Sequence, residues 1–208
     1  MTMREKPAET QFSVHDLIRR RWSPRAFADR AVSAEQIGSL LDAARWAASC
    51  NNAQPWRFVI ATREQAERHA AFVACLAEGN RTWALYAPVL MLTVAKTTFD
   101  DGTPNRHAWH DVGQAAASLA IQATAMGLVI HQMAGFSVEQ ARATFEIPAG
   151  YEPVAAIAIG YTGDPNSLPD YLRERELAPR SRRPVSDVAF AGRWEATWPP
   201  MGAPSKER

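Results

Sequence analysis

Apolar residues recur along the chain in two spacings, which predict an alternation of helices and strands. Helical spacing is found in residues 12–21, 34–47 and 109–126. Continuous apolar runs, typical of buried strands, are found at 56–61, 88–95 and 153–160, with a shorter run at 128–133. Because helices and apolar strands are interleaved, we expect an α/β or α+β fold with a covered sheet.

Local signals refine the expected helix boundaries. In the first helix, Phe12, Leu17 and Ile18 are expected to face inward. A Ser or Thr stands three residues before a Gln in three pairs: Ser33 with Gln36, Thr62 with Gln65, and Ser137 with Gln140. This spacing is typical of a helix N-terminus. We expect a helix after each pair, the second reaching about Glu78.

The segment from Trp109 to Met126 is apolar around most of its circumference, and Gly127 follows it as a natural helix end. A helix that is apolar on most faces is buried on most faces. One domain of this size rarely buries a helix so completely. The pattern therefore favours a homodimer in which a second subunit covers part of this helix.

Length and composition limit the classes of protein. The chain has 208 residues, 47% of them hydrophobic, 22% charged, and a net charge of +1. These values favour one folded domain over residues 1–208 and indicate no nucleic-acid or membrane-surface binder. After Thr162 the sequence becomes rich in proline and charge, so we expect an extended C-terminal arm from about residue 170 to 208.

The first residues carry charges and no apolar core, so they do not read as a signal peptide. Polar residues interrupt the longest apolar stretch, so we expect no transmembrane span. Cys50 and Cys75 form no metal-binding spacing and no disulfide framework. We therefore expect a cytoplasmic protein.

Several common motifs are missing from the sequence. It has no dinucleotide-binding GxGxxG after a strand, no phosphate-binding GxxxxGK[ST] and no GxSxG nucleophile elbow. His107 and His110 stand beside Asp111, but no further metal ligand stands out, and a solvated helix start is favoured. We assign no metal site and no catalytic side chain.

Two basic clusters lie far apart in the sequence. In the first, Arg21 and Arg25 flank Ser23, an arrangement suited to phosphate oxygens. The second contains Arg180 and Arg182. Each cluster alone reads as a solvated turn, but on a nearly neutral protein the two together favour one shared anion.

Two further segments suit a planar ligand. The loop Ser49–Trp56 places small residues and amides between a helix and a strand. The run Gly127–Gly135 ends in a turn at Ala134 and Gly135, where backbone N–H groups can face a ligand. Taken alone, each segment is better interpreted as a simple connection.

Taken in order, these segments resemble those of the nitroreductase-like flavoprotein family. The matching segments are Arg21–Phe27, Ser49–Trp56, Met126–Leu128, Ala134–Gly135, Pro153–Tyr161 and Arg180–Arg182. The resemblance implies an α+β, three-layer fold with a mixed β-sheet flanked by helices. It also implies an intertwined homodimer with FMN bound at each subunit interface.

The resemblance implies roles for particular residues. Those implied to hold the FMN phosphate and ribityl chain are Arg21, Trp22, Ser23, Arg180 and Arg182, with Trp22 standing where relatives carry His or Arg. Arg25 is implied to lie near the ribityl chain or the pyrimidine edge. The residues implied to lie beside the flavin ring are Ser49, Cys50 and Asn52 from the other subunit, and Asn80, Ala134 and Gly135.

The activity implied is hydride transfer from NAD(P)H, through FMN, to a small electron-poor acceptor such as a nitro compound or a quinone. Two alternatives stay open: a flavin-binding protein without turnover, and a specialised oxidase that uses no nicotinamide. His131 lies in the right stretch for a proton donor, but a structural role is favoured.

Overall fold

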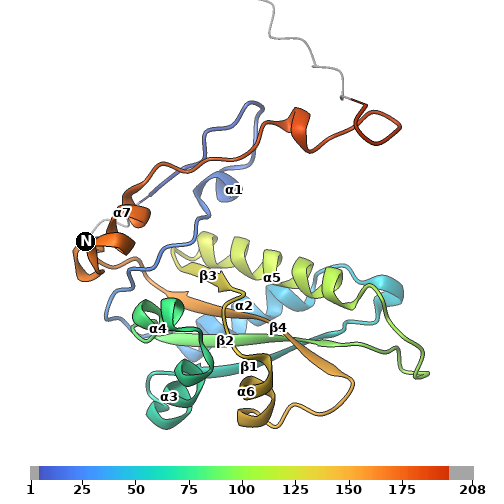
Figure 1. The fold of residues 1–208 in the computed structure, drawn as a ribbon, viewed down its shortest axis with the longest axis horizontal. Helices are drawn as coiled ribbons and strands as arrows, with labels where there is room; N and C mark the ends of the chain where they lie inside the picture. Colours follow the sequence, from blue (N-terminus) through green and yellow to red (C-terminus); the bar gives the residue numbers. More distant parts are fainter. Residues whose placement is uncertain (1–4, 197–208) are drawn as a thin grey trace, which may run out of the picture. The chain divides into compact units, whose positions relative to one another are not determined.

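The computed structural model describes residues 5–196, which fall into two compact units divided after Ala178. The first unit contains the sheet and all the α-helices (Figure 1). The second unit begins at Pro179 and contains the 3-10 turn η3 (Val185–Asp187) and a contact between the rings of Phe190 and Trp194. The last part of the expected C-terminal arm, residues 197–208, lies outside the described residues.

The first unit is built on a four-stranded sheet with the order β1-β2-β4-β3. The strands are β1 (Trp56–Thr62), β2 (Val89–Lys96), β3 (Val129–Met133) and β4 (Tyr151–Gly160). All three pairings among the described residues are antiparallel, so the expected mixed sheet is wrong for this chain. The α+β class is confirmed, because no strand pair here needs a parallel crossover.

Helices cover both faces of the sheet, which confirms the three expected layers (Figure 1). On one face lie α2 (Ala34–Arg45) and α5 (Ala108–Ala125), and on the other α3 (Ala66–Cys75), α4 (Glu78–Ala84) and α6 (Val138–Thr144). One buried cluster includes Leu40, Leu119 and Ile157, and the other Phe72, Trp83 and Leu92. Consecutive side chains of β2 point to opposite faces, so this mostly apolar strand serves both clusters.

Helix α5 ends where the sequence predicts, and Gly127 adopts the left-handed φ of +72° that favours glycine. Half of its residues are buried within the unit, whereas Trp109, Gly113 and Ala117 are exposed at helical spacing. This exposed strip is narrow, whereas the sequence predicts a helix that is apolar on most faces. The homodimer stays a prediction.

Two of the three capping pairs are confirmed: Ser33 with Gln36 forms a complete capping box, and Ser137 accepts the Gln140 N–H. The Thr62 pair is wrong as a cap. Thr62 is the last residue of β1, and α3 begins only after Gln65. The helix predicted to reach about Glu78 ends at Cys75, and a second helix that was not predicted starts at Glu78.

The first predicted helix is too long. Helix α1 spans only Asp16–Arg20, with His15 as its N-cap, and contains no buried residue. The inward prediction is wrong for Phe12 and Ile18, which are 44% and 53% exposed. Helix α7 (Asp170–Leu177) was not predicted, because its sequence is mostly charged and buries only Leu172 and Glu176.

Candidate functional site

The first basic cluster lies against β3, the edge strand of the sheet. His131 on β3 donates from Nδ1 to the backbone carbonyl of Pro24 at 3.0 Å, since a carbonyl can only accept. Beside it, Arg21 Nη1 donates to Ser23 Oγ at 3.2 Å. The structure therefore brings Arg21 and Ser23 together, as the sequence predicts.

The cations of this loop influence His131. Burial is the main cause that lowers the pKa of His131 to about 4, and the positive charges of Arg25 and Arg21 lower it further. Hydrogen bonds to the backbone of Pro24 and Ser23 act in the opposite direction. Two guanidinium groups thus act on one neutral imidazole, which packs against the Trp83 ring at 4.5 Å between centroids. These observations agree with the structural role favoured for His131.

Glu176 is a residue of this site that the sequence did not point to. Its side chain, on α7, is only 2% exposed, and its carboxylate accepts hydrogen bonds from the backbone N–H groups of Arg25 and Ala26. A charged residue on a polar helix is normally solvated, so no local pattern marks it as buried. The only sequence signal is its place four residues after Leu172, on the same helical face.

The turn after β3 is tied to α4. Asn80 Nδ2 donates to the Gly135 carbonyl at 3.0 Å, and the Ala77 N–H donates to the same oxygen at 2.9 Å. A Cβ at Gly135 would lie 2.7 Å from Asn80 Nδ2, so only glycine fits without a shift. The structure therefore brings Asn80 and Gly135 together, next to Ala134, although their sequence positions are 55 apart.

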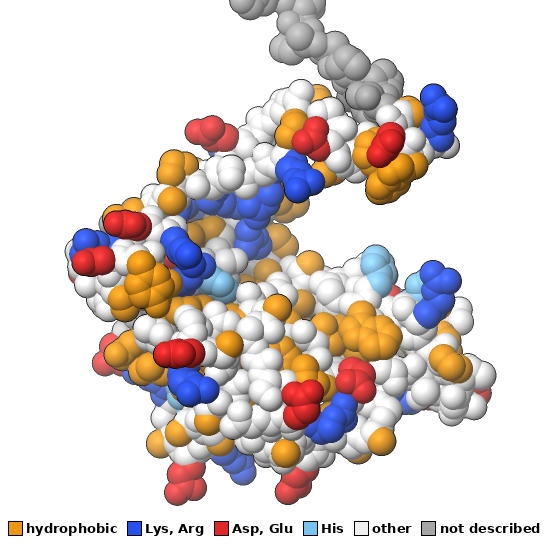
Figure 2. All heavy atoms as spheres, viewed as in Figure 1, with side chains coloured by type: hydrophobic (Ala, Val, Ile, Leu, Met, Phe, Trp, Pro, Cys, Tyr) orange, Lys and Arg blue, Asp and Glu red, His pale blue; other side chains and the backbone are white. Residues whose placement is uncertain are grey.

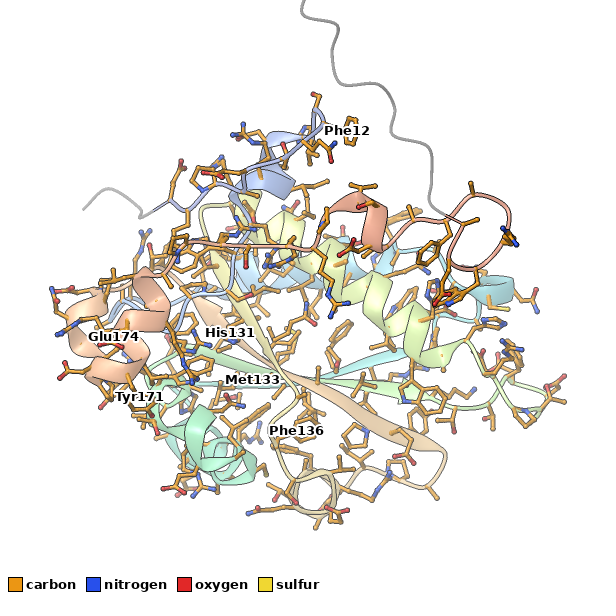
Figure 3. All side chains as sticks on the ribbon, turned by 45° about the horizontal axis from the view of Figure 1, so that its top comes forward. Phe12, His131, Met133, Phe136, Tyr171 and Glu174 are labelled. Carbon is orange, nitrogen blue, oxygen red and sulfur yellow. The ribbon has the colours of Figure 1, made fainter. Side chains whose placement is uncertain are left out.

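The basic loop and the Asn80–Gly135 contact both lie along β3. His131 contacts the basic loop, and Ala134, three residues further, starts the turn that Asn80 holds. Three residues of strand span about 10 Å. Figure 3 shows His131 and Met133 on β3, followed by Phe136 beyond the turn.

The loop with Ser49, Cys50 and Asn52 lies elsewhere, at the start of α5. The Cys50 backbone N–H donates to the Asp111 carboxylate in the first turn of α5, whereas β3 follows the last turn (Figure 1). An 18-residue helix is about 27 Å long. The predicted flavin-binding residues of one chain are therefore divided between the two ends of α5.

This loop has an unusual backbone. Asn51, Asn52 and Gln54 have φ values of +52°, +54° and +47°, a region that residues other than glycine seldom occupy. Ser49 Oγ accepts the Gln54 N–H at 3.1 Å and closes the loop. Asn is one of the residues that tolerates this conformation best, which explains the two adjacent asparagines.

Trp22, Arg180 and Arg182 were also predicted to bind FMN. The Trp22 side chain is buried, with Lys6 over its ring at 5.0 Å. Arg180 and Arg182 belong to the second unit, so their meeting with Arg21 stays a prediction.

A pocket of about 330 Å³ is lined by Asp29, Ala31, Val32, Thr62, Arg63, Glu64 and Pro88. In it, Arg63 contacts Asp29 and also donates to the Tyr86 carbonyl. None of the predicted flavin-binding residues lines it. We therefore do not place the candidate site there.

Other kinds of site find no support in residues 5–196. No group of three His, Cys, Asp or Glu residues within this range has a metal-binding arrangement. Over the same residues, every helix is too short or too polar to cross a membrane. On the face shown in Figure 2, acidic and basic side chains alternate over α3, α4 and α6.

The fold and site define a three-layer α+β protein whose polar loops gather along an edge strand. The chain belongs to the nitroreductase family, whose model matches residues 18–161. This range includes the Arg21–Arg25 loop, the Ser49–Asn52 loop, Asn80 and the Ala134–Gly135 turn. It ends before α7 and the second unit.

Three relatives cover most of the chain. A crystal structure described as an oxidoreductase containing FMN has a TM-score of 0.87 and 38% identity, covering 95% of this chain and 100% of its own. An uncharacterised 15.4 kDa protein of Mycolicibacterium smegmatis is 36% identical over 66% of this chain and 97% of its own length. A protein of Stenotrophomonas maltophilia, provisionally named as an NADH dehydrogenase/NAD(P)H nitroreductase, is 28% identical over 75% of this chain and 88% of its own length.

Proposed function

We propose that this chain is an FMN-dependent oxidoreductase that transfers hydride from NAD(P)H to small electron-poor acceptors, such as nitro compounds or quinones, in a ping-pong cycle. The observation that carries the proposal is the gathering of the Arg21–Arg25 loop and the Asn80–Gly135 contact along β3. Family membership and the FMN-containing relative support the same cofactor. When bound, the flavin supplies the hydride chemistry.

The residues present suit FMN. Arg21 and Ser23, with Arg180 and Arg182 of the second unit, offer the charged and hydroxyl donors that a terminal phosphate requires. Arg25 offers a cation for the pyrimidine edge, where negative charge on the reduced ring is stabilised. A Cβ at Gly135 would lie 2.7 Å from Asn80 Nδ2, so glycine is needed where the Gly135 carbonyl accepts the Asn80 hydrogen bond.

A complete site needs two copies of the chain. Ser49, Cys50 and Asn52 are proposed to approach the ring from the second subunit, because in one chain they lie at the far end of α5 from β3. Two α5 helices packed antiparallel would bring the start of one next to the end of the other. Asn80, Ala134, Gly135 and Trp22 are proposed to act from the first subunit.

The decisive experiment is the absorbance spectrum and cofactor content of the purified protein, followed by steady-state assays with NADH and NADPH. We expect a yellow protein that releases FMN and oxidises a reduced nicotinamide when a quinone or nitroaromatic is added. A colourless protein that cannot be reconstituted with FMN would contradict the proposal. Bound FMN without nicotinamide oxidation would instead indicate a flavin store, a sensor or a specialised oxidase.

A further inference from the structure

One peptide group of the basic loop is held at both of its polar atoms. The Arg25 N–H donates to Glu176 Oε1 and Oε2 at 3.1 and 3.0 Å, and the Pro24 carbonyl accepts from His131 Nδ1 at 3.0 Å. This N–H and this carbonyl belong to the same planar peptide unit. Its orientation is therefore fixed by two side chains, one from α7 and one from β3.

On the loop side, the Glu176 carboxylate accepts hydrogen bonds from backbone N–H groups. Besides the Arg25 N–H, Oε1 accepts the Ala26 N–H at 3.2 Å. A carboxylate loses several kcal/mol of hydration on burial, and hydrogen bonds from backbone N–H groups compensate for part of this loss. Near it, Lys6 Nζ donates to the backbone carbonyls of Glu176 and Ala178 at 2.7 and 2.6 Å, which holds the end of α7 in place.

Burial of a carboxylate costs free energy, and a simple turn can be held without one. The peptide that this carboxylate holds carries Arg25. Rotation of that peptide would redirect the half-buried Arg25 side chain and the exposed Ser23 beside Pro24. Figure 3 shows the two supports of the loop: His131 on β3, and α7 with Tyr171 and Glu174. Neither α7 nor Glu176 falls within the range matched by the family model.

We propose that Glu176, together with His131, is a positioning residue that directs the Arg25 guanidinium toward the pyrimidine edge of FMN and thereby sets the reduction potential of the bound flavin. This inference rests on the proposed function. A correctly placed cation stabilises the reduced anionic flavin more than the oxidised one and raises the potential. Glu176 itself is an anion, so its direct electrostatic effect on the flavin has the opposite sign.

These opposite signs give a clear test, measured as the midpoint potential of the bound flavin. Glu176→Leu removes the acceptor and the charge, whereas Glu176→Gln removes the charge but keeps one acceptor oxygen. If Glu176 positions Arg25, the Leu variant binds reduced FMN about tenfold less well relative to oxidised FMN. For a two-electron couple this is about 30 mV lower in potential. The Gln variant then recovers most of the wild-type value.

Glu174→Leu is the matched control, because Glu174 is exposed on the same helix and carries the same charge. In an Arg25→Ala background, Glu176→Leu is expected not to lower the potential further, since the cation that it positions is absent. If Glu176→Leu does not fold, His131→Leu tests the other half of the same support, with His131→Gln as the variant that keeps a donor.

Equal upward shifts in the Leu and Gln variants would show that Glu176 acts only as a charge, and would overturn the inference. So would a potential that matches the Glu174→Leu control. A wild-type protein that binds no FMN would instead contradict the proposed function itself, so the two failures are distinguishable.

Discussion

Cys50 and Asp111 are 61 positions apart, yet the Cys50 backbone N–H donates to the Asp111 carboxylate at 3.0 Å. Asp111 is 2% exposed and lies in the first turn of α5, where a negative charge also interacts favourably with the helix dipole. This bond attaches the strained loop of residues 49–54 to the long helix.

We therefore expect Asp111→Ala to lower the free energy of unfolding by about 1–3 kcal/mol, because it leaves the half-buried Cys50 N–H without its acceptor. Urea denaturation measures this directly. Asp111→Asn keeps an acceptor oxygen and is the matched control, expected to lose less. Equal losses in the two variants would show that the charge, not the bond to Cys50, matters.

Local signals were sufficient for some parts of this fold. The Ser33–Gln36 capping box and the end of α5 at Gly127 depend on neighbouring residues, and both were predicted. The separate helix starting at Glu78 was missed because its first turn contains Gly79 and Asn80 and lacks an apolar period. Sequence spacing alone therefore gave no sign of a second helix starting at Glu78.

The family pattern alone named the candidate site residues, and their binding of FMN stays a prediction. Arg21, Ser23, Asn80 and Gly135 were predicted, and their contacts within the chain are now seen. The hydrogen bond from the Arg25 N–H to the Glu176 carboxylate joins residues 151 positions apart, and no local pattern encodes such a pairing. It depends on tertiary packing of α7, a helix with almost no apolar face.

The Asn80–Gly135 contact predicts a coupled pair of substitutions. Gly135→Ala places a Cβ 2.7 Å from Asn80 Nδ2, so Asn80 must move and its bond to the Gly135 carbonyl is lost. We expect a loss of about 1–3 kcal/mol in unfolding free energy. In an Asn80→Ala background the clash is absent and Gly135→Ala is expected to be nearly neutral. Additive losses in the double variant would argue against this contact.

The low pKa of His131 predicts loss of stability in acid. Its folded pKa is about 4, below the ordinary value of 6.5, so between these values the unfolded chain binds more protons. The contribution of neutral His131 to the free energy of unfolding is therefore fully present above about pH 6.5. It falls as the pH is lowered toward 4, by at most about 1.4 kcal/mol per pH unit.

Urea denaturation of wild type and His131→Gln at pH 7, 6 and 5 isolates this effect. The pKa of His69 is also lowered by burial, but that residue is the same in both proteins and cancels in the difference. We expect the wild type to lose more stability than the variant as the pH falls. Parallel curves would mean that the pKa of His131 is the same in the folded and unfolded chains.

The proposed FMN site, whose residues are divided across α5 in one chain, predicts a homodimer of two 23.0 kDa chains. Ala117 is exposed on α5, and Ala117→Arg is expected to weaken the dimer and reduce FMN content together. Ala70→Arg, at an exposed position on α3 on the opposite face of the sheet, is the matched control. Light scattering measures the mass. A wild-type monomer that retains FMN would contradict the two-subunit site.

The remaining prediction concerns the two basic clusters. We expect Arg21 and Arg182 to bind the same FMN phosphate, because a protein of net charge +1 gains little from two isolated arginine clusters, whereas one phosphate compensates both. Each charge-assisted bond contributes roughly 1.5–3 kcal/mol. Arg21→Ala and Arg182→Ala should therefore each raise the FMN dissociation constant by about 10- to 100-fold.

Riboflavin is the built-in control, because it lacks the phosphate and should bind the variants and the wild type about equally. The double variant should not equal the sum of the single ones, since two residues that share one ligand group are coupled. Fluorescence titration of the apoprotein with each flavin measures all of these constants. If Arg182→Ala leaves FMN affinity unchanged, the second unit does not contribute to the phosphate site, and the phosphate is bound by the Arg21–Arg25 loop alone.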